Sequence, residues 1–165
     1  MTTAPDLIEP VIGFRKWRID DRHLSSPYAR VRWREREMRA RCHRHSFGGP
    51  RSDLRALDEE HDAPHPNCHC GIYAYYEPHA RPRVIYVRLA WGIVTLWGRI
   101  EAHGNGMRAE HARVEALASS PEWPRSHRRA VERVAGELGI DLVQHTELER
   151  AAGEYGGRLP DSLVP

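Results

Sequence analysis

The sequence predicts an α+β fold with a mostly antiparallel sheet or small barrel and C-terminal helices. Apolar and polar residues alternate over residues 84–100, and a Gly104-Asn-Gly106 turn leads into a second alternating run, as in a β-hairpin. Apolar residues recur at helical spacing over residues 126–138. Strands that come first and helices that come last are typical of this fold class.

The sheet is expected to begin at residue 11, after a lead-in that contains two prolines. Residues 11–19 have the composition of a strand, and a bulge near Gly13 would place Phe14 and Trp17 on one face. Residues 31–42 leave two interpretations open. Apolar residues alternate there as in a strand, but acid–arginine pairs also stand at helical spacing.

The middle of the chain is expected to form the hairpin. Residues 71–76 predict a short helix that ends before Pro78. Residues 84–100 carry apolar side chains on both faces, which predicts a strand buried on both sides. The tight turn then leads into the partner strand at residues 107–116.

The C-terminal part predicts two helices and a short strand. The first helix covers residues 126–138 and ends at Gly139. Residues 140–143 predict a short strand. Thr146 is expected to cap a second helix that runs to Gly153.

Three cysteines, Cys42, Cys68 and Cys70, are the clearest carriers of chemistry in the chain. A disulfide fits poorly because the count is odd and because a pair separated by one residue would close a strained ring. Residues 47–67 are rich in glycine and proline and predict a loop, not an apolar face that would bury free thiols. The pattern therefore indicates metal ligands, and structural zinc with four thiolate or imidazole ligands fits best.

A histidine is expected to complete the set of four ligands, and the chain contains eleven histidines. His69 and His43 adjoin cysteines and point away from them if the chain is extended there. His61 lies seven residues before Cys68, and two prolines between them allow the loop to fold back. The predicted metal ligands are Cys42, His61, Cys68 and Cys70, with His65 and His45 as alternatives to the histidine.

Five short motifs are spread over residues 13–116. They are Ala40-x-Cys42, His61-x-Ala63-Pro64, Cys68-x-Cys70-Gly-Ile-Tyr-Ala74, Trp97-Gly-x-Ile100 and Gly106-x-Arg-Ala-Glu110. This set resembles a family of small uncharacterised proteins, found mainly in actinobacteria and their phages, that has no known activity. A histidine before Ala-Pro recurs in that family with the three cysteines, so the resemblance implies His61 as the fourth ligand. Residues 117–165 lie outside the pattern.

Two other metal centres use similar ligands. Three cysteines and one histidine can also hold a 2Fe-2S cluster, which is our second cofactor hypothesis. A zinc deaminase needs a glutamate two residues after the histidine and a C-x-x-C pair, whereas this chain has Ala63 and a C-x-C pair. Four protein ligands leave no position for a reactive water, so we expect a structural site and not a hydrolytic one.

Composition places the chain among globular proteins, with 40% hydrophobic and 29% charged residues. Its 165 residues predict a single domain, 1–165, with a β-rich metal-binding core at 11–116 and a helical extension at 117–165. The sequence contains neither an apolar run of the roughly 18–20 residues that cross a bilayer nor a secretory signal, so we expect a cytoplasmic protein.

Charge is unevenly distributed along the chain, although the net charge is only +2. Residues 15–44 carry eleven arginines or lysines against four acids, whereas residues 101–165 carry eleven acids against eight arginines. A basic face attracts polyanions. A nucleic-acid-binding regulatory protein is therefore one functional alternative, with a basic segment that contains Arg30, Arg32, Arg34 and Arg36.

The preferred hypothesis is a non-enzymatic, zinc-stabilised binding or adaptor module with a protein partner; an Fe-S redox sensor is a further alternative. Polar residues near the hairpin turn form a candidate acid/base cluster: Glu101, His103, Arg108, Glu110 and His111. We expect Arg108 and Glu110 instead to pair across the hairpin with Arg99 or Glu101, as ladder support. Most aromatic residues are expected in the core, with Tyr75 or Tyr76 facing solvent at a binding surface.

Overall fold

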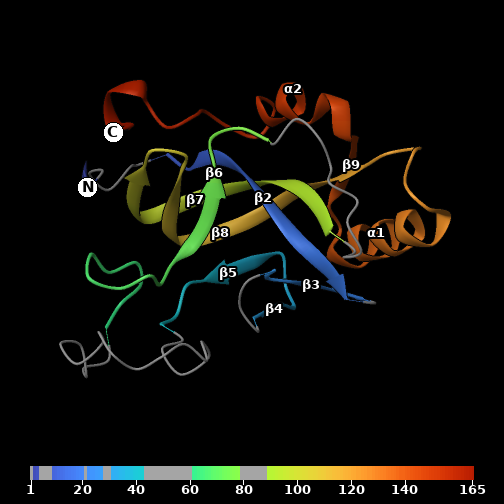
Figure 1. The fold of residues 1–165 in the computed structure, drawn as a ribbon, viewed down its shortest axis with the longest axis horizontal. Helices are drawn as coiled ribbons and strands as arrows, with labels where there is room; N and C mark the ends of the chain where they lie inside the picture. The colour runs from blue at the N-terminus through green and yellow to red at the C-terminus, as the bar shows by residue number, and fades with distance from the viewer. Residues whose placement is uncertain (1, 4–8, 21, 28–30, 43–60, 79–88) are drawn as a thin grey trace.

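The computed structural model describes residues 2–3, 9–20, 22–27, 31–42, 61–78 and 89–165 (Figure 1). In this part of the chain, nine strands form one sheet, and the strand pairs other than β8–β9 are antiparallel. The strands are β1 (Thr2–Thr3), β2 (Val11–Asp20), β3 (His23–Ser25), β4 (Arg32–Trp33), β5 (Glu37–Arg39), β6 (Ile72–Tyr75), β7 (Leu89–His103), β8 (Gly106–Ser119) and β9 (Asp141–Gln144). The helices are α1 (Arg125–Leu138) and α2 (Leu148–Ala152), with short 3₁₀ turns η2 (His145–Glu147) and η3 (Asp161–Leu163). The predicted α+β class with a mostly antiparallel sheet is confirmed.

The β7–β8 hairpin is the centre of the fold. Its strands pair from Gly92–Leu117 to His103–Gly106, so the predicted tight turn is present. Residues 90–96 of β7 are buried, as predicted for a strand covered on both sides. β7 also pairs with β2, β8 pairs with β6, and β6 pairs with β2, so these four strands close a ring. The first part of the predicted strand, residues 84–88, lies outside the described residues.

The short helix predicted for residues 71–76 is wrong, because this segment contains the strand β6. Ile72 and Ala74 are buried, whereas Tyr73 is exposed and Tyr75 is half-buried, which is the two-residue period of a strand. β6 pairs with the first residues of β8. Pairing along this strand overrides the local sequence preference that favoured a helix.

Strand β2 forms as predicted but without the bulge near Gly13. Its register with β7 is continuous, and Phe14 and Trp17 are both fully buried. Because these two residues point to opposite faces of the strand, the sheet is covered on both sides here. The open choice for residues 31–42 is resolved in favour of strands, since β4 pairs with β3 and β5 pairs with β8.

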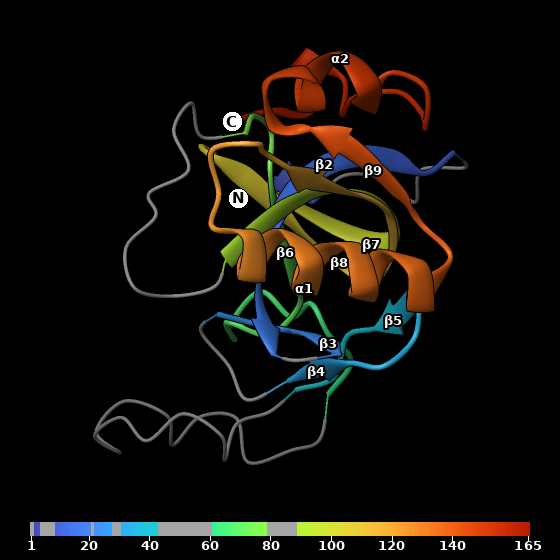
Figure 2. The same ribbon diagram turned by 90° about the vertical axis from the view of Figure 1, so that its right-hand side faces the viewer.

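The C-terminal elements pack against the sheet (Figure 2). Helix α1 confirms the predicted helix and ends at Gly139, whose φ of 62° is left-handed. β9 confirms the predicted short strand and lies parallel to β8. The predicted cap at Thr146 is wrong, because Thr146 lies inside η2 and α2 begins at Leu148 without a side-chain cap.

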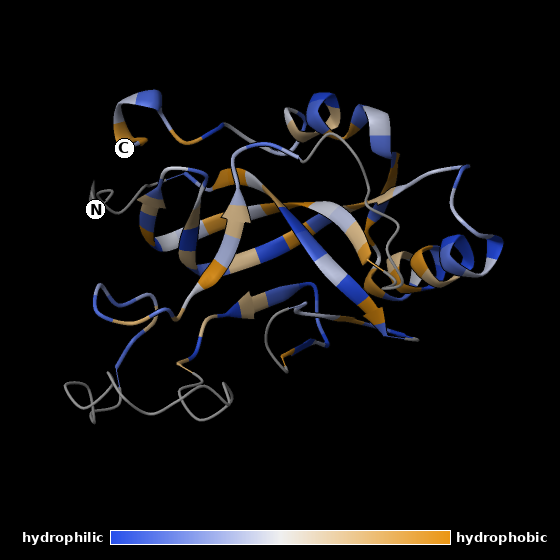
Figure 3. Cartoon of the chain, in the orientation of Figure 1, coloured by the Kyte–Doolittle hydropathy of each residue, from blue (hydrophilic) through white to orange (hydrophobic). Residues whose placement is uncertain are grey.

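Apolar residues of α1 lie on the part nearest the sheet, and polar residues gather toward its far end (Figure 3). The buried residues of α1 are Ala130, Val131, Val134 and Ala135. They join the same hydrophobic core as Phe14 of β2 and Leu117 of β8. Within the described ranges, no helix has the length and apolar character needed to cross a bilayer.

Candidate metal centre

The structure brings together the four predicted ligands Cys42, His61, Cys68 and Cys70. One ligand atom from each lies within 4.8 Å of all the others. The Cys42 and Cys68 sulfurs are 3.7 Å apart, and the Cys70 sulfur is 3.4 Å from His61 Nε2. These sulfur distances are far longer than a disulfide bond of about 2.05 Å, and all three cysteines are free.

The ligands come from two segments that the fold holds side by side. Cys42 follows β5, and the Ala40 amide donates a 2.6 Å hydrogen bond to the Glu110 carbonyl of β8. The other three ligands lie in residues 61–71, here called the metal loop, which leads into β6. Within it the Cys68 amide donates to the His65 carbonyl at 2.9 Å, which makes a tight turn.

Gly71 closes the metal loop in a conformation that favours glycine. Its φ is 126°, a value that residues with a Cβ rarely adopt. A Cβ at this position would also lie 3.2 Å from the Cβ atoms of Arg108 and Pro64. Glycine therefore lets the chain turn from the ligand Cys70 directly into β6 while it packs closely on β8.

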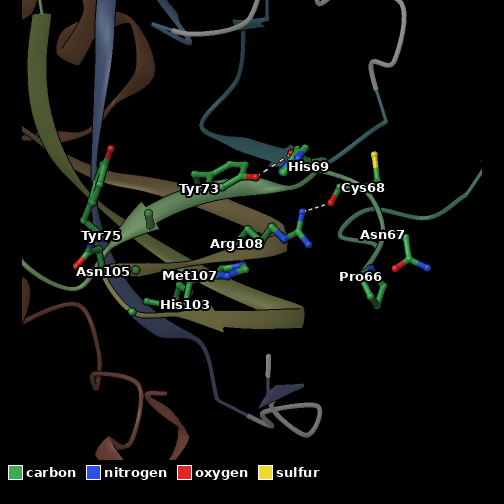
Figure 4. Close-up of a pocket in the computed structure, with 13 residues that line it drawn as sticks. Pro66, Asn67, Cys68, His69, Tyr73, Tyr75, His103, Asn105, Met107 and Arg108 are labelled. Carbon is green, nitrogen blue, oxygen red and sulfur yellow. Dashed lines mark hydrogen bonds between the residues drawn. The ribbon is translucent and has the colours of Figure 1, made fainter. Parts of the chain in front are cut away.

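A buried ion pair lies beneath the metal loop. Arg108 and Glu101 side chains are each 3% exposed, and the guanidinium donates to Glu101 Oε2 from Nε, at 2.8 Å, and from Nη2. The same guanidinium donates to the loop carbonyl of Cys68 (Figure 4). It also donates to the carbonyls of Cys70, at 3.2 Å, and His65, at 3.1 Å. Arg108 thus donates to three carbonyls of the metal loop, and it fixes the loop to β8.

Two further side chains hold the metal loop. Arg99 Nη1 donates to the Pro64 carbonyl at 3.3 Å, and the Tyr73 hydroxyl donates to the His69 carbonyl at 2.9 Å. Both donors stand on strands of the sheet, β7 and β6. The loop is therefore fastened to the sheet by hydrogen bonds to its backbone, and its three candidate ligands remain close to Cys42.

The pKa values of the Cys68 and Cys70 thiols reflect the close approach of the four side chains. Burial, followed by the neighbouring Cys68, raises the pKa of the Cys70 thiol to about 12. Burial also opposes the Cys68 thiolate, but hydrogen bonds from the Cys70 amide and from the other cluster side chains outweigh it and lower the pKa of this thiol. A divalent cation would favour thiolates at both positions, because it supplies the opposite charge that the protein groups lack.

The alternative ligand histidines have other surroundings. The His65 ring lies 4.6 Å from the His61 ring, and His65 Nδ1 accepts a 3.3 Å hydrogen bond from the Asn67 amide. His69 is exposed, although it stands between two ligands. His45, like His43, lies outside the described residues.

The residues of the candidate acid/base cluster do not converge on one point, because they pair with different partners along the hairpin. Arg108 pairs with Glu101, as the ladder interpretation predicted. Glu110 instead contacts Arg39 at 3.0 Å and His111 at 3.4 Å. Burial by itself would raise the pKa of the Glu110 carboxyl. The Arg99 amide, His111 and Arg39 have the larger combined effect, so this pKa is lowered. These are ion pairs of the ladder type and not a convergent acid/base site.

Two arginines of the basic segment pair with carboxylates. Arg32 lies 3.5 Å from Asp20, and Arg36 lies 2.6 Å from the buried Glu115. Arg34 is exposed, and Arg30 lies outside the described residues. Two of these arginines therefore already have carboxylate partners that compete with phosphate.

Sequence reasoning missed two features of the site. Arg108 was expected only to pair across the hairpin, whereas it also donates hydrogen bonds to the metal loop. Tyr73 was not expected to be the exposed tyrosine; it is 43% exposed, whereas Tyr75 and Tyr76 are half-buried. The two-residue period of Ile72 to Tyr75 was the available signal for this exposure.

The chain was also compared with known proteins. No protein-family model, no curated protein and no solved structure matches it. The family resemblance of residues 13–116 therefore stays a prediction.

Proposed function

We propose that Cys42, His61, Cys68 and Cys70 bind one structural Zn²⁺, and that the protein is a non-enzymatic, zinc-stabilised binding module. The spacing of the ligand atoms carries the proposal. Zinc bonds of about 2.3 Å to sulfur and about 2.0 Å to nitrogen, at tetrahedral angles, separate two sulfurs by about 3.8 Å and a sulfur from a nitrogen by about 3.5 Å. The corresponding distances here are 3.7 and 3.4 Å.

The same spacing supports one ion over a two-iron cluster. A 2Fe-2S cluster places two irons between two pairs of ligands and spreads the ligand atoms further apart than one ion does. Here all four atoms lie within 4.8 Å of one another. Three thiolates and one imidazole are also a common structural zinc set, and they leave no coordination position for water.

Such an ion would link distant parts of the chain. Cys42 and Cys68 are 26 residues apart, so the metal closes a long loop and contributes its binding free energy to the folded state. Arg108 would act as the outer support that fixes the loop carbonyls. The metal would thus shape a surface, which is the role of structural zinc in binding modules. The predicted protein partner and the cytoplasmic location stay predictions.

The direct test is elemental mass spectrometry with an absorption spectrum, on the full chain purified without added metal. We expect one zinc per chain and no visible absorption. Cys68→Ser should lose the zinc, whereas His69→Ala, which changes an exposed histidine between two ligands, should keep it. Iron with visible absorption, or zinc that both variants retain equally, would overturn the proposed site.

A further inference from the structure

A pocket of about 660 Å³ lies between the metal loop and the sheet (Figure 4). Its walls are residues 66–69 of the metal loop, residues 73–75 of β6 and residues 103–108 around the hairpin turn. This volume is in the range of small-ligand sites. Because Cys68 belongs to the wall, the shape of the pocket depends on the loop that the four ligands hold.

One wall of the pocket is aromatic and already fixed in place. The Tyr73 side chain is 43% exposed, and its hydroxyl is held by the His69 carbonyl at 2.9 Å. Tyr75 follows on the same face of β6, and its ring lies 5.7 Å from the Trp91 ring. An exposed ring that is already fixed loses little conformational freedom when a ligand stacks on it.

The other walls offer hydrogen bonds without negative charge. Asn67 and Asn105 each carry an amide that both donates and accepts. His103 Nε2 is buried and has no hydrogen-bond partner within the described part of the chain. None of the described residues that line the pocket is an aspartate or a glutamate. A ligand with a polar edge would pair with the two amides, and no carboxylate there repels an anion.

Positive charge lies beside the aromatic wall. Lys16 Nζ is 5.7 Å from the centre of the Trp91 ring, which in turn contacts Tyr75. Arg18 stands two residues further along β2 on the same face and is exposed. Lys16 is thus linked through the Trp91 ring to Tyr75 of the pocket wall, and the pocket with these two cations forms the candidate binding surface.

We propose that this surface binds the bases and phosphates of a single-stranded nucleic acid. A base supplies a flat face for Tyr73 and a polar edge for the amides of Asn67 and Asn105, and the linked phosphates are anions that Lys16 attracts. An apolar peptide side chain would use only the ring and would make no hydrogen bond to the amides and no contact with the cations. The inference rests on the proposed zinc site, because the metal loop forms one wall.

The test uses the zinc-loaded full chain and fluorescent single-stranded DNA and RNA of about eight nucleotides, a length within the site sizes of known single-strand binders. Anisotropy titrations at several salt concentrations give the affinity. We expect the affinity to fall with salt, with a slope of about −0.7 for each phosphate contacted. A duplex of the same sequence should compete poorly, since its bases are already stacked.

Variants assign the binding to this surface. Tyr73→Ala should weaken binding about tenfold, and Tyr73→Phe, which keeps the ring, should change it less than about twofold. Leu142→Ala is the matched control, because Leu142 is also 43% exposed but lies on β9, and it should change nothing. Lys16→Gln should reduce the magnitude of the salt slope by about 0.7. Zinc content is measured for every variant.

The outcomes separate the two proposals. Absence of zinc in the wild-type chain overturns the zinc site itself. Zinc-loaded protein that binds no single strands, or binds them equally well with Tyr73→Ala, overturns the nucleic-acid inference and leaves the zinc site intact; a protein partner would give this result. If Tyr73→Ala loses zinc, the salt slope of Lys16→Gln tests the nucleic-acid inference instead, because Lys16 lies outside the metal loop. An unchanged salt slope then counts against the inference.

Discussion

The two ends of β8 are stabilised by different means. At its beginning, Arg108 pairs with Glu101 and binds carbonyls of the metal loop, so that end is held by buried charge and by the ligand cluster. At its other end, β9 pairs with residues 116–119, and α1 and α2 add fully buried apolar side chains such as Val131 and Leu148. Figure 1 places the metal loop and α1 at opposite ends of the molecule.

This difference shows where the fold can respond to its surroundings. An apolar layer is stable through burial alone and needs no ion. The metal loop is polar and only partly buried, so the proposed zinc would contribute to its conformation, and this contribution would be lost on metal removal. The candidate binding pocket lies at this end. The candidate metal cluster and the apolar scaffold thus occupy separate ends of one strand.

Metal removal should produce the largest difference between the two ends. Structural zinc contributes roughly 10 kcal/mol of apparent binding free energy in small domains. We expect a chelator to remove most hydrogen-exchange protection from β6 and the metal loop while α1 and β9 keep theirs. Exchange followed by mass spectrometry measures both ends in one sample. Equal loss of hydrogen-exchange protection in α1 would contradict the view that the two ends are stabilised independently.

Arg108→Met should have the next largest effect. It leaves the Glu101 charge buried without its partner, which costs about 3–5 kcal/mol, and it removes the donors to the loop carbonyls. Urea unfolding and zinc affinity should both decrease.

The double variant Arg108→Met/Glu101→Met removes the charge on both sides and serves as the control. It should recover part of the lost stability, and the remaining deficit measures the hydrogen bonds to the metal loop. A double variant with wild-type stability and zinc affinity would show that these bonds contribute nothing.

The two ends also differed in how far the sequence predicted them. The hairpin turn at Gly104, the helix that ends at Gly139 and the three candidate cysteine ligands followed from local rules on glycine, periodicity and ligand type. The choice of His61 over His65 and His45 also used the family resemblance. β6 did not follow from these rules, because a run of four residues is too short for periodicity to distinguish strand from helix. The second role of Arg108 could not be read from spacing, since it depends on carbonyls up to 43 residues away that only the folded loop brings close.

Leu148→Ala tests the apolar end with a smaller effect. Leu148 is fully buried in α2, and truncation of such a side chain costs about 3 kcal/mol through lost burial and the cavity left behind. We expect a lower unfolding midpoint in urea with one zinc per chain retained. Loss of zinc in this variant would mean that the two ends are not independent.

Glu115→Gln should give the smallest effect and tests how acid acts on the region between the ends. Burial by itself would raise the pKa of the Glu115 carboxyl. Hydrogen bonds from Thr95, Arg113 and Arg36 have the larger combined effect, so this pKa is lowered in the folded protein. Its stabilisation is therefore present above the ordinary glutamate pKa of about 4.3 and is lost as pH falls through the lower folded value. The variant should lose about 2 kcal/mol at neutral pH, typical of a hydrogen-bonded charge.

Acid also releases metal by protonating its ligands. The pH dependence of wild-type stability alone therefore does not show which group causes the loss of stability in acid. Wild type and Glu115→Gln share the metal cluster and Glu110, so the effects of those groups cancel in the difference between their unfolding free energies. We expect this difference to narrow as pH falls below about 4. A difference that stays constant from neutral pH to pH about 3 would mean that the Glu115 charge contributes no acid sensitivity, and that the metal end alone accounts for it.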